Sequence, residues 1–452
     1  MDFSKLAKSL NPYTIKKGFS YLKQYGFQEF KVRLSERFEK EEVDYNEWCK
    51  NDILRDEERK AQRGRIWEYP PLISVVVPIY KTPEVFLRQM IESVTAQTYP
   101  HWQLCIADGS GDTAETKRIV DSYLSDKRIK YKILAENLGI ADNTNAAMEL
   151  ADGDYIALFD HEDLLSENAL YEVADRICKT GAEIVYTDED KVTSDLSERY
   201  QPNFKPDFNL DLLRSNNYIC HLLVVKKTLV QEVGGQKKEF DGAQDHEFLF
   251  RCVEKAKGIE HIPKVLYHWR CHEASTASNP QSKRYAYEAG QRALEDYCLR
   301  KGWKATVSGL KHLGFYREDY EDSVFCQRPE IGIWAKPLPG GRDVFGIRHP
   351  KGFLVSGLYE NDGSMRYAGL RKGYSGPMHR AALQQSAPAA DLRSMEVCST
   401  LKERYAQTIA ELIEACQGLP TAAQETKILQ KSMEFCKEAT AAGYGILWDP
   451  QA

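Results

Sequence analysis

The middle of the chain alternates short apolar runs with longer amphipathic stretches. An unbroken apolar run such as residues 73–77 is typical of a strand buried on both faces of a sheet. We expect strands of this sheet at residues 73–77, 102–107, 129–134, 155–159 and 184–186. Helices are predicted between the first four, at 83–94, 113–124 and 141–150. Strands and helices in this alternation predict an α/β fold with a parallel sheet and right-handed crossovers.

Polar residues gather where four of these predicted strands end. Parallel strands end at the same edge of a sheet, and ligands bind outside that edge. The four clusters are Pro78-Ile79-Tyr80, Asp108-Gly109-Ser110, Glu136-Asn137-Leu138-Gly139 and Asp160-His161-Glu162-Asp163. Neighbouring carboxylates repel one another, and a bound Mg²⁺ or Mn²⁺ would offset that repulsion in the last cluster. Taken alone, the same cluster also suits a solvated acidic turn that caps the next helix.

The segments on either side differ from this central region. Residues 1–70 are charged and helical in pattern, and the dense mixed charge from 36 to 65 is typical of a helical neck or linker. Basic and aromatic residues in the first 33 positions suit either contact with an anionic membrane surface or packing on the chain's own domain. Residues 319–452 are rich in Gly and Pro and then helical in pattern, at 395–416 and 423–442. We therefore divide the chain into 1–70, 71–318 and 319–452.

Composition narrows the class of protein. A chain of 452 residues is too long for one ordinary core. The net charge of −6 argues against bulk binding of nucleic acid. Eleven cysteines without a CxxC pair fit reduced thiols better than a disulfide framework. Neither a signal peptide nor an apolar stretch long enough to span a bilayer is found, so we expect a cytoplasmic protein suited to peripheral contact with the inner face of the cell membrane.

Several motifs follow one another in a fixed order. They are Val76-Val77-Pro78-Ile79-Tyr80, Ser93-Val94-Thr95-Ala96-Gln97-Thr98-Tyr99, Ala107-Asp108-Gly109-Ser110, Asn137-Leu138-Gly139 and Phe159-Asp160-His161-Glu162-Asp163. With them, residues 72–317 resemble the family 2 glycosyltransferases of the GT-A fold. The segment Tyr186-Thr187-Asp188-Glu189-Asp190-Lys191 is similar to one in the bacterial members that build cell-surface polysaccharides. The resemblance implies a Rossmann-like, mostly parallel sheet flanked by helices.

The resemblance also assigns the donor side of a site. It implies that the nucleotide is contacted by Pro78, Tyr80, Asp108, Asn137, Gly139 and Asp160. Ala107 stands where the family's DDGS-like motif has its first acid, a departure that would loosen contacts with the base or ribose. The family's DxD-type motif has Glu162 as its second acid here. The ligands implied for Mn²⁺ or Mg²⁺ are Asp160, Glu162, Asp163 and, from a later segment, His268.

The segment 240–248 resembles the family segment that begins a helix with the catalytic base. By position the base is Asp245, with His246 and Glu247 as neighbouring alternatives. A carboxylate there can take the proton that an acceptor hydroxyl loses as it attacks the anomeric carbon. An acid at that place also simply favours the helix dipole. Further candidates for contact with acceptor or diphosphate are Asp188, Glu189, Gln244, Arg270 and His272, and for 188–190 a solvated turn is an equal alternative.

The C-terminal region resembles parts of a second module. Residues 353–364 and 435–450 match its pattern, but Ser432-Met433-Glu434 stands where a base would be, so we expect a degenerate half-module. The Gln-x-x-Arg-Trp signature of processive synthases is absent, which favours a non-processive enzyme.

Together these features predict an inverting, metal-dependent hexosyl- or deoxyhexosyltransferase for surface polysaccharide. Its donor would be a UDP- or dTDP-linked sugar and its acceptor a glycan, with a lipid-linked glycan as one candidate. A nucleotidyltransferase is one alternative, although Lys81-Thr82-Pro83-Glu84 is not the Gly-rich loop that such enzymes usually carry after the first strand. A non-catalytic glycan-binding or scaffold protein is the other, and the retained acids argue against it.

Overall fold

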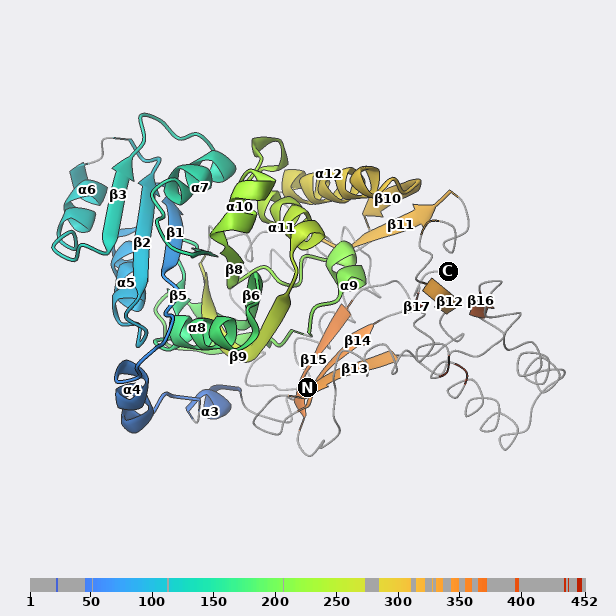
Figure 1. Ribbon diagram of the computed structural model, residues 1–452, viewed down its shortest axis with the longest axis horizontal. Helices are drawn as coiled ribbons and strands as arrows, with labels where there is room; N and C mark the ends of the chain where they lie inside the picture. The colour runs from blue at the N-terminus through green and yellow to red at the C-terminus, as the bar shows by residue number, and fades with distance from the viewer. Residues whose placement is uncertain are drawn as a thin grey trace.

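The computed structural model describes residues 45–50, 52–111, 114–205, 207–272, 284–309 and 314–321. Farther along it describes the backbone of six short strands, and it includes a few single residues elsewhere. Figure 1 shows how these elements are arranged.

A mixed sheet of nine strands forms the centre of the described part of the chain. Its order is β3-β2-β1-β4-β8-β6-β9-β5, and β7 pairs with β6. The strands are β1 (Ile73–Ile79), β2 (Trp102–Asp108), β3 (Ile129–Ile133), β4 (Tyr155–Leu158), β5 (Leu164–Leu165), β6 (Ile184–Thr193), β7 (Arg199–Asn203), β8 (Leu223–Lys226) and β9 (Ile259–Cys271). All five strands predicted from the apolar runs are present, and the predicted α/β fold class is confirmed.

The two halves of this sheet run differently. Strands β3, β2, β1 and β4 are parallel, as the alternating pattern predicts. From β4 onward the directions mix, because β8 is antiparallel to both β4 and β6, whereas β9 is parallel to β6. Strands β5 and β7 join antiparallel to β9 and β6.

Helices cover both faces of the sheet (Figure 1). One face packs against α5 (Glu84–Thr95), α6 (Ala114–Asp121) and α8 (Ala169–Thr180). The other packs against α7 (Ile140–Met148), α10 (Lys227–Val233), α11 (Gln244–Lys255) and α12 (Arg284–Lys301). The short elements α9 (Leu210–Ser215) and η1 (Lys238–Phe240) lie in the connections.

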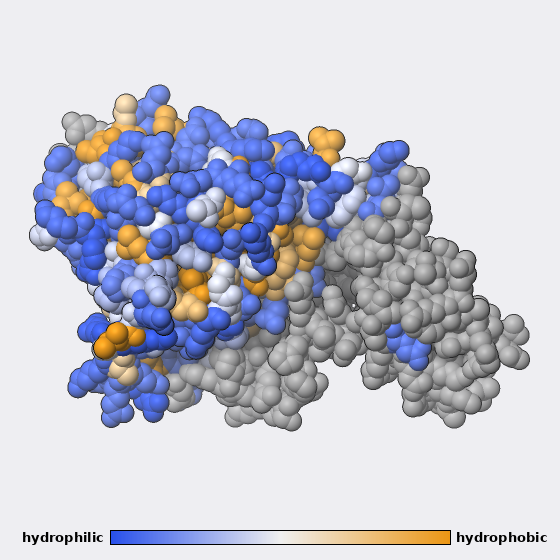
Figure 2. All heavy atoms as spheres, viewed as in Figure 1, coloured by the Kyte–Doolittle hydropathy of each residue, from blue (hydrophilic) through white to orange (hydrophobic). Residues whose placement is uncertain are grey.

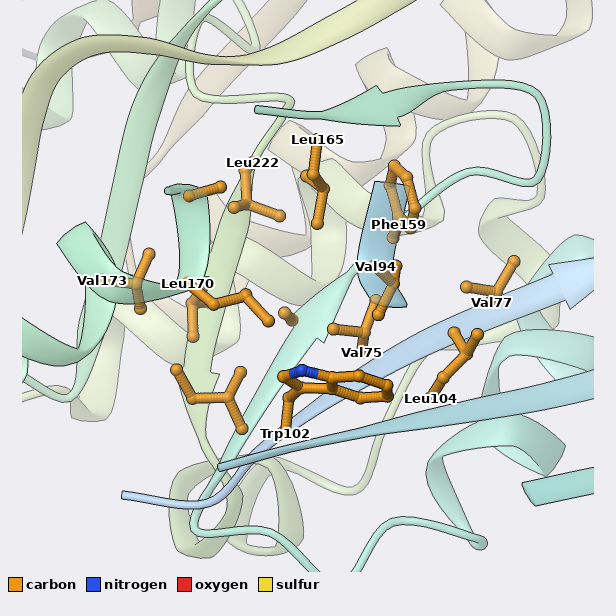
Figure 3. Close-up of a cluster of buried hydrophobic side chains, with 14 of the residues drawn as sticks. Val75, Val77, Val94, Trp102, Leu104, Phe159, Leu165, Leu170, Val173 and Leu222 are labelled. Atoms are coloured by element: carbon orange, nitrogen blue, oxygen red, sulfur yellow. The ribbon is translucent and has the colours of Figure 1, made fainter. Parts of the chain in front are cut away.

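Strand β1 shows why the sheet centre reads as an unbroken apolar run. All seven of its residues are buried, and alternate side chains enter the two opposite cores. Figure 3 shows the first core, to which Val75 and Val77 of β1, Val94 of α5 and Leu170 of α8 all belong. The sheet thus has a packed core on each face, and polar residues lie where its strands end.

In the predicted neck the structure describes two short helices, α3 (Tyr45–Lys50) and α4 (Asp56–Arg63). Both pack on the sheet domain. The Tyr45 hydroxyl donates to Asp190 at 2.8 Å, Trp48 meets Phe204 edge to face at 6.0 Å, and Arg59 pairs with Glu167. This part of the neck is therefore attached to the domain by buried contacts of α3 and a half-buried ion pair of α4.

Small sheets follow the central domain. Strands β10 (Ala305–Gly309) and β11 (Tyr316–Tyr320) form a hairpin. Beyond them lie β12 (Ile331–Ala335), β13 (Asp343–Arg348), β14 (Leu354–Tyr359), β15 (Met365–Arg371), β16 (Met395–Val397) and β17 (Gly445–Trp448). The predicted helix at 395–416 is wrong at its start, because residues 395–397 form strand β16 paired with β12. The described residues do not include the rest of that range or positions 432–434. Of the predicted helix at 423–442 they include only two single residues, both helical.

The visible face of the described domain is mostly hydrophilic, with apolar residues in small separate groups (Figure 2). Within the described part of the chain, no helix is both long enough and apolar enough to cross a membrane.

Candidate active site

The turns after β1 and β2 are tied together at the carboxyl edge of the sheet. Asp108 ends β2 and is fully buried. One of its carboxylate oxygens accepts the backbone N–H of Ser110 at 2.8 Å, and the other accepts the Tyr131 hydroxyl at 2.7 Å. The Ser110 hydroxyl oxygen in turn accepts the N–H of Lys81 at 2.7 Å. Both oxygens of Asp108 thus support the turn, whereas Tyr80 beside it is 41% exposed and accessible to a ligand.

The Asn137-Leu138-Gly139 turn is closed by side-chain amides. The Asn137 side-chain oxygen accepts hydrogen bonds from the Asn143 amide at 2.8 Å and from the backbone N–H of Gly139 at 3.2 Å. The Asn143 oxygen accepts the N–H of Leu138 at 3.1 Å. These bonds fix the turn that leads into α7, beside the ends of β1 and β2.

A carboxylate from far along the chain caps this helix. Asp241 accepts the N–H of Ala141, in the first turn of α7, at 3.1 Å. Gly139, at the N-cap position, has no side chain to do so. Its φ is +97°, and a Cβ there would lie 2.6 Å from the second oxygen of Asp241. Glycine is therefore required here for both its backbone conformation and the close approach of Asp241.

Beyond the end of β4, three side chains form a group suited to a divalent cation. Ligand atoms of Asp160, Asp163 and His221 all lie within 4.8 Å of one another. The His221 ring stacks on Tyr267 with ring centres 4.7 Å apart, and it meets the edge of Trp269 at 5.9 Å. Two carboxylates and an imidazole are ligands that Mn²⁺ and related ions accept, so the residues present fit the predicted metal.

Asp163 is the buried member of this group, with 1% of its surface exposed. It accepts the backbone N–H of Arg270 at 2.8 Å and the hydroxyl of Tyr267. Burial, together with the neighbouring charge of Asp160, raises the pKa of the Asp163 carboxyl well above its usual value. A nearby cation would reverse that effect, because it favours the ionised form.

Two of the predicted metal ligands lie outside this group. The Glu162 carboxylate contacts the ring of His272 instead. His268 uses one ring nitrogen toward Asp190 at 2.6 Å and the other toward the Ser166 hydroxyl at 2.8 Å. Neighbouring residues of a strand face opposite sides, so Tyr267 of β9 faces the acidic group while His268 faces away from it. Their metal roles stay predictions, and His221 stands where His268 was expected.

Arg270, a candidate for diphosphate contact, is fully buried. Its Nε donates to the backbone oxygen of Glu162 at 2.7 Å, and its Nη1 donates to the side chain of Gln89 at 2.7 Å and the backbone oxygen of Ser194 at 3.1 Å. These bonds hold the acidic loop against β9. Arg270 thus supports the loop at 160–163, and its direct contact with a diphosphate stays a prediction.

The acids at 188–190 lie inside β6, so the alternative of a solvated turn is wrong. Asp188, Glu189 and Asp190 are 1%, 7% and 0% exposed. Buried carboxylates are costly unless they are paired and hydrogen-bonded. The partners are His261 for Asp188, Lys205 for Glu189, and Tyr45, Arg199 and His268 for Asp190.

The predicted base lies at the start of α11. Asp245 is half-buried, and one of its carboxylate oxygens accepts the side-chain amide of Asn217 at 2.8 Å. Of the alternatives, His246 is buried and bonds the backbone oxygen of Leu213 at 2.8 Å, and Glu247 is buried in an ion pair with Arg251. Both alternatives are committed to internal partners, so Asp245 is the best placed of the three. The side chain of Gln244 accepts the backbone N–H of Gly242, which closes the turn before the helix.

Three residues of this site were not found from the sequence: Asn217, His221 and Asp241. Each is brought in by a long-range contact. Asn217 and His221 come from the segment before β8, which shows no motif of its own. Asp241 was inside a motif, but its partner Ala141 is 100 residues away.

Residues 74–233 match the family model described as glycosyl transferase family 2. The chain contains a family 2 glycosyltransferase domain. The resemblance seen in the motifs is thereby confirmed. Relatives of this family 2 domain include an uncharacterized protein, y4gI, of Sinorhizobium fredii, which is 43% identical over 55% of this chain and 28% of its own length. The O-antigen biosynthesis protein RfbC of Myxococcus xanthus is 34% identical over 59% of this chain and 21% of its own length. The chain thus spans between about a fifth and just over a quarter of these curated relatives.

Among solved structures, TarS residues 1–349 of S. aureus in complex with UDP-GlcNAc is similar to half of the chain. The TM-score is 0.42 and the identity 20%, covering 50% of this chain and 66% of that one. A mannosyltransferase of Pyrobaculum calidifontis in complex with GDP-Man and Mn²⁺ has a TM-score of 0.37 and an identity of 15%, covering 54% of this chain and 79% of its own.

Proposed function

We propose that the family 2 domain is a glycosyltransferase that moves a sugar from a nucleotide-diphosphate donor to a hydroxyl of a glycan acceptor in surface polysaccharide synthesis. The family match and the relative named for O-antigen biosynthesis support this proposal. The observation that carries it is the group of Asp160, Asp163 and His221 beyond β4, at the edge where the donor-side turns after β1 and β2 also lie.

A Mn²⁺ or Mg²⁺ ion held by this group would neutralise charge that grows on the departing diphosphate. Exposed Asp160 is accessible from solvent, whereas buried Asp163 is held by Arg270 and Tyr267. On the donor side, Tyr80 offers an exposed aromatic ring next to the bonded turns of Asp108 and Asn137. We assign the nucleotide to this side, and a UDP- or dTDP-linked hexose or deoxyhexose as the donor.

Asp245 would act as the general base. As the acceptor hydroxyl attacks the anomeric carbon, its proton passes to the Asp245 carboxylate while the diphosphate leaves from the opposite side, so the configuration inverts. The Asn217 amide orients the carboxylate by its 2.8 Å bond. We further propose addition of one or a few sugars on the cytoplasmic side of the membrane, with a lipid-linked glycan as one candidate acceptor.

One assay tests the reaction class. Purified protein is incubated with Mn²⁺ and a panel of nucleotide sugars, with and without glycan acceptors. Release of nucleoside diphosphate is expected. Release of pyrophosphate would instead indicate a nucleotidyltransferase, and no release from any donor would indicate a glycan-binding or scaffold protein.

A further inference from the structure

Residues 216–221 touch both halves of the proposed active site. The Asn217 amide donates to the base Asp245, and His221 belongs to the acidic group with Asp160 and Asp163. Between them, the backbone N–H of Cys220 donates to the Asn217 oxygen at 3.4 Å. A shift of this loop would therefore move a candidate metal ligand and a partner of the base together.

A buried ion pair lies against this loop. Lys205 is 1% exposed, and its ammonium group donates to the backbone oxygens of Ile219, at 2.5 Å, and His221. It also donates to the Glu189 carboxylate at 3.3 Å. The same carboxylate oxygen accepts the backbone N–H of His221 at 3.2 Å. The peptide groups on both sides of the His221 Cα are thus held by one ion pair.

The pair itself is held firmly. The second oxygen of Glu189 accepts the side-chain amide of Asn203 at 3.1 Å, and Glu189 is part of the long strand β6. An ammonium group has three N–H donors, and here it has three acceptors. Replacing a buried ion pair by apolar residues often leaves stability unchanged or improved, so packing alone does not account for a charge pair at this place.

The loop also needs such support. Cys220 has a φ of +37°, in the left-handed region that residues other than glycine seldom adopt. A conformation of this kind persists only where its surroundings over-determine it, and such residues cluster at functional sites. The bonds on either side of Cys220, to the oxygens of Ile219 and His221, provide that constraint.

We propose that Lys205 and Glu189 are positioning residues, which hold the 216–221 loop so that His221 reaches the metal while Asn217 reaches the base. This inference rests on the proposed function, because it concerns the metal and the base of that reaction. Both Lys205 and Glu189 are buried beneath the loop. Their effect is transmitted through the backbone of His221.

The test measures Mn²⁺ binding directly, without turnover. Electron paramagnetic resonance titration yields the Kd for Mn²⁺ with UDP present, and pulsed measurements detect the nitrogen of a directly bound imidazole. The double variant Lys205→Met, Glu189→Gln removes both charges at once and so leaves no unpaired buried ion. Residues that orient metal ligands typically contribute 10- to 100-fold to affinity, so the Kd should rise at least about tenfold and the imidazole signal should weaken.

Two further variants complete the experiment. His221→Ala should abolish the imidazole signal. Lys130→Met is the matched control, because Lys130 likewise donates to a backbone oxygen, that of Leu150, and pairs with an acid, Asp152, but lies on β3 away from the loop. The control should keep the Kd within about twofold of the wild type. Circular dichroism melts verify that each variant is folded.

The outcomes separate the two proposals. If wild-type protein binds Mn²⁺ and the folded double variant binds it equally well, the positioning role is wrong while the proposed function stands. If the imidazole signal persists in His221→Ala, His221 is not the ligand and the inference is overturned. If the wild-type protein binds no Mn²⁺ with UDP, the metal-dependent mechanism itself fails.

Discussion

Exposed Asp160, in the loop after β4 of the first half of the central sheet, contrasts with the buried acids of β6 in the second half. In the first half, Asp160 follows the end of β4 and is exposed at the edge. In the second half, Asp188, Glu189 and Asp190 lie within β6 and are buried against a histidine, a lysine, an arginine and a tyrosine. An acid exposed at the sheet edge, such as Asp160, keeps its charge available to a ligand. A buried acid, whether in β6 or in the same loop like Asp163, is held by internal partners. Similar acidic motifs in the sequence therefore serve different purposes.

The largest expected effect is on the transfer rate, and it distinguishes the proposed base Asp245 from a buried, paired acid such as Asp188. Asp245→Asn should lower the rate of transfer by at least about 100-fold, because a general base typically contributes 10²–10⁴-fold. Donor binding should be retained, since the base acts on the acceptor. Transfer rate and the Kd for the donor measure the two effects.

Asp188→Asn is the matched variant for that test. It should lower the free energy of unfolding by about 2 kcal/mol, through loss of a charge-assisted bond with His261, while donor binding persists. Loss of donor binding in Asp245→Asn would place that residue in the donor site instead. Full stability of Asp188→Asn would break the comparison between the two halves.

A second effect on stability, of similar size at pH 7, depends on pH. Although burial opposes ionisation, His268 and Arg199 lower the pKa of Asp190 below its usual value. A carboxyl with a lowered folded pKa stabilises the protein above the unfolded pKa of about 3.9, and this contribution is lost as the pH falls through the folded pKa. Asp190→Asn should therefore be less stable than wild type by about 2 kcal/mol at pH 7, with the difference shrinking below pH 4.

Urea unfolding from pH 7 down to pH 2 measures this difference. The hydrogen-bonding partners of Asp190 in the described residues are Tyr45 on α3, Arg199 on β7 and His268 on β9. A difference in unfolding free energy that stays constant across this range would show that the Asp190 charge does not contribute.

The smallest effect concerns the cap that joins the two halves. Asp241→Ala should lower the free energy of unfolding by about 1 kcal/mol, as loss of a helix cap usually does. Gly139→Ala should also destabilise, because its Cβ would approach Asp241 to 2.6 Å. The double variant lacks this clash, because the Asp241 carboxylate is gone. Its loss of unfolding free energy should therefore be smaller than the sum of the losses of the two single variants. Additive losses in urea unfolding would contradict the contact.

Much of the first half could be predicted from the sequence because its signals are local. The run at 73–77 and the helical spacing after Pro83 depend on residues close together in the chain, and both elements are observed. The polar strand ends followed directly from the parallel order of β1, β2 and β4. The family match at residues 74–233 covers this stretch and continues through β6 and β8 of the second half.

The second half depended on strand register, which local pattern does not contain. Pairing of β6 with β9 sets Asp190 opposite His268, and that histidine bonds Asp190 instead of joining Asp160 and Asp163. His221 entered the group instead, from a loop with no motif.

By itself, then, the sequence determined the family, the parallel half of the sheet and the edge at which a donor would bind, because periodicity and ordered motifs are properties of neighbouring residues. The tertiary structure alone decided which acids are exposed and which are paired, and which histidine faces the acidic group. Those outcomes depend on contacts between residues tens to more than a hundred positions apart, such as Asp163 with Tyr267 and Ala141 with Asp241. Burial and charge pairing across such contacts are set only when the strands come together.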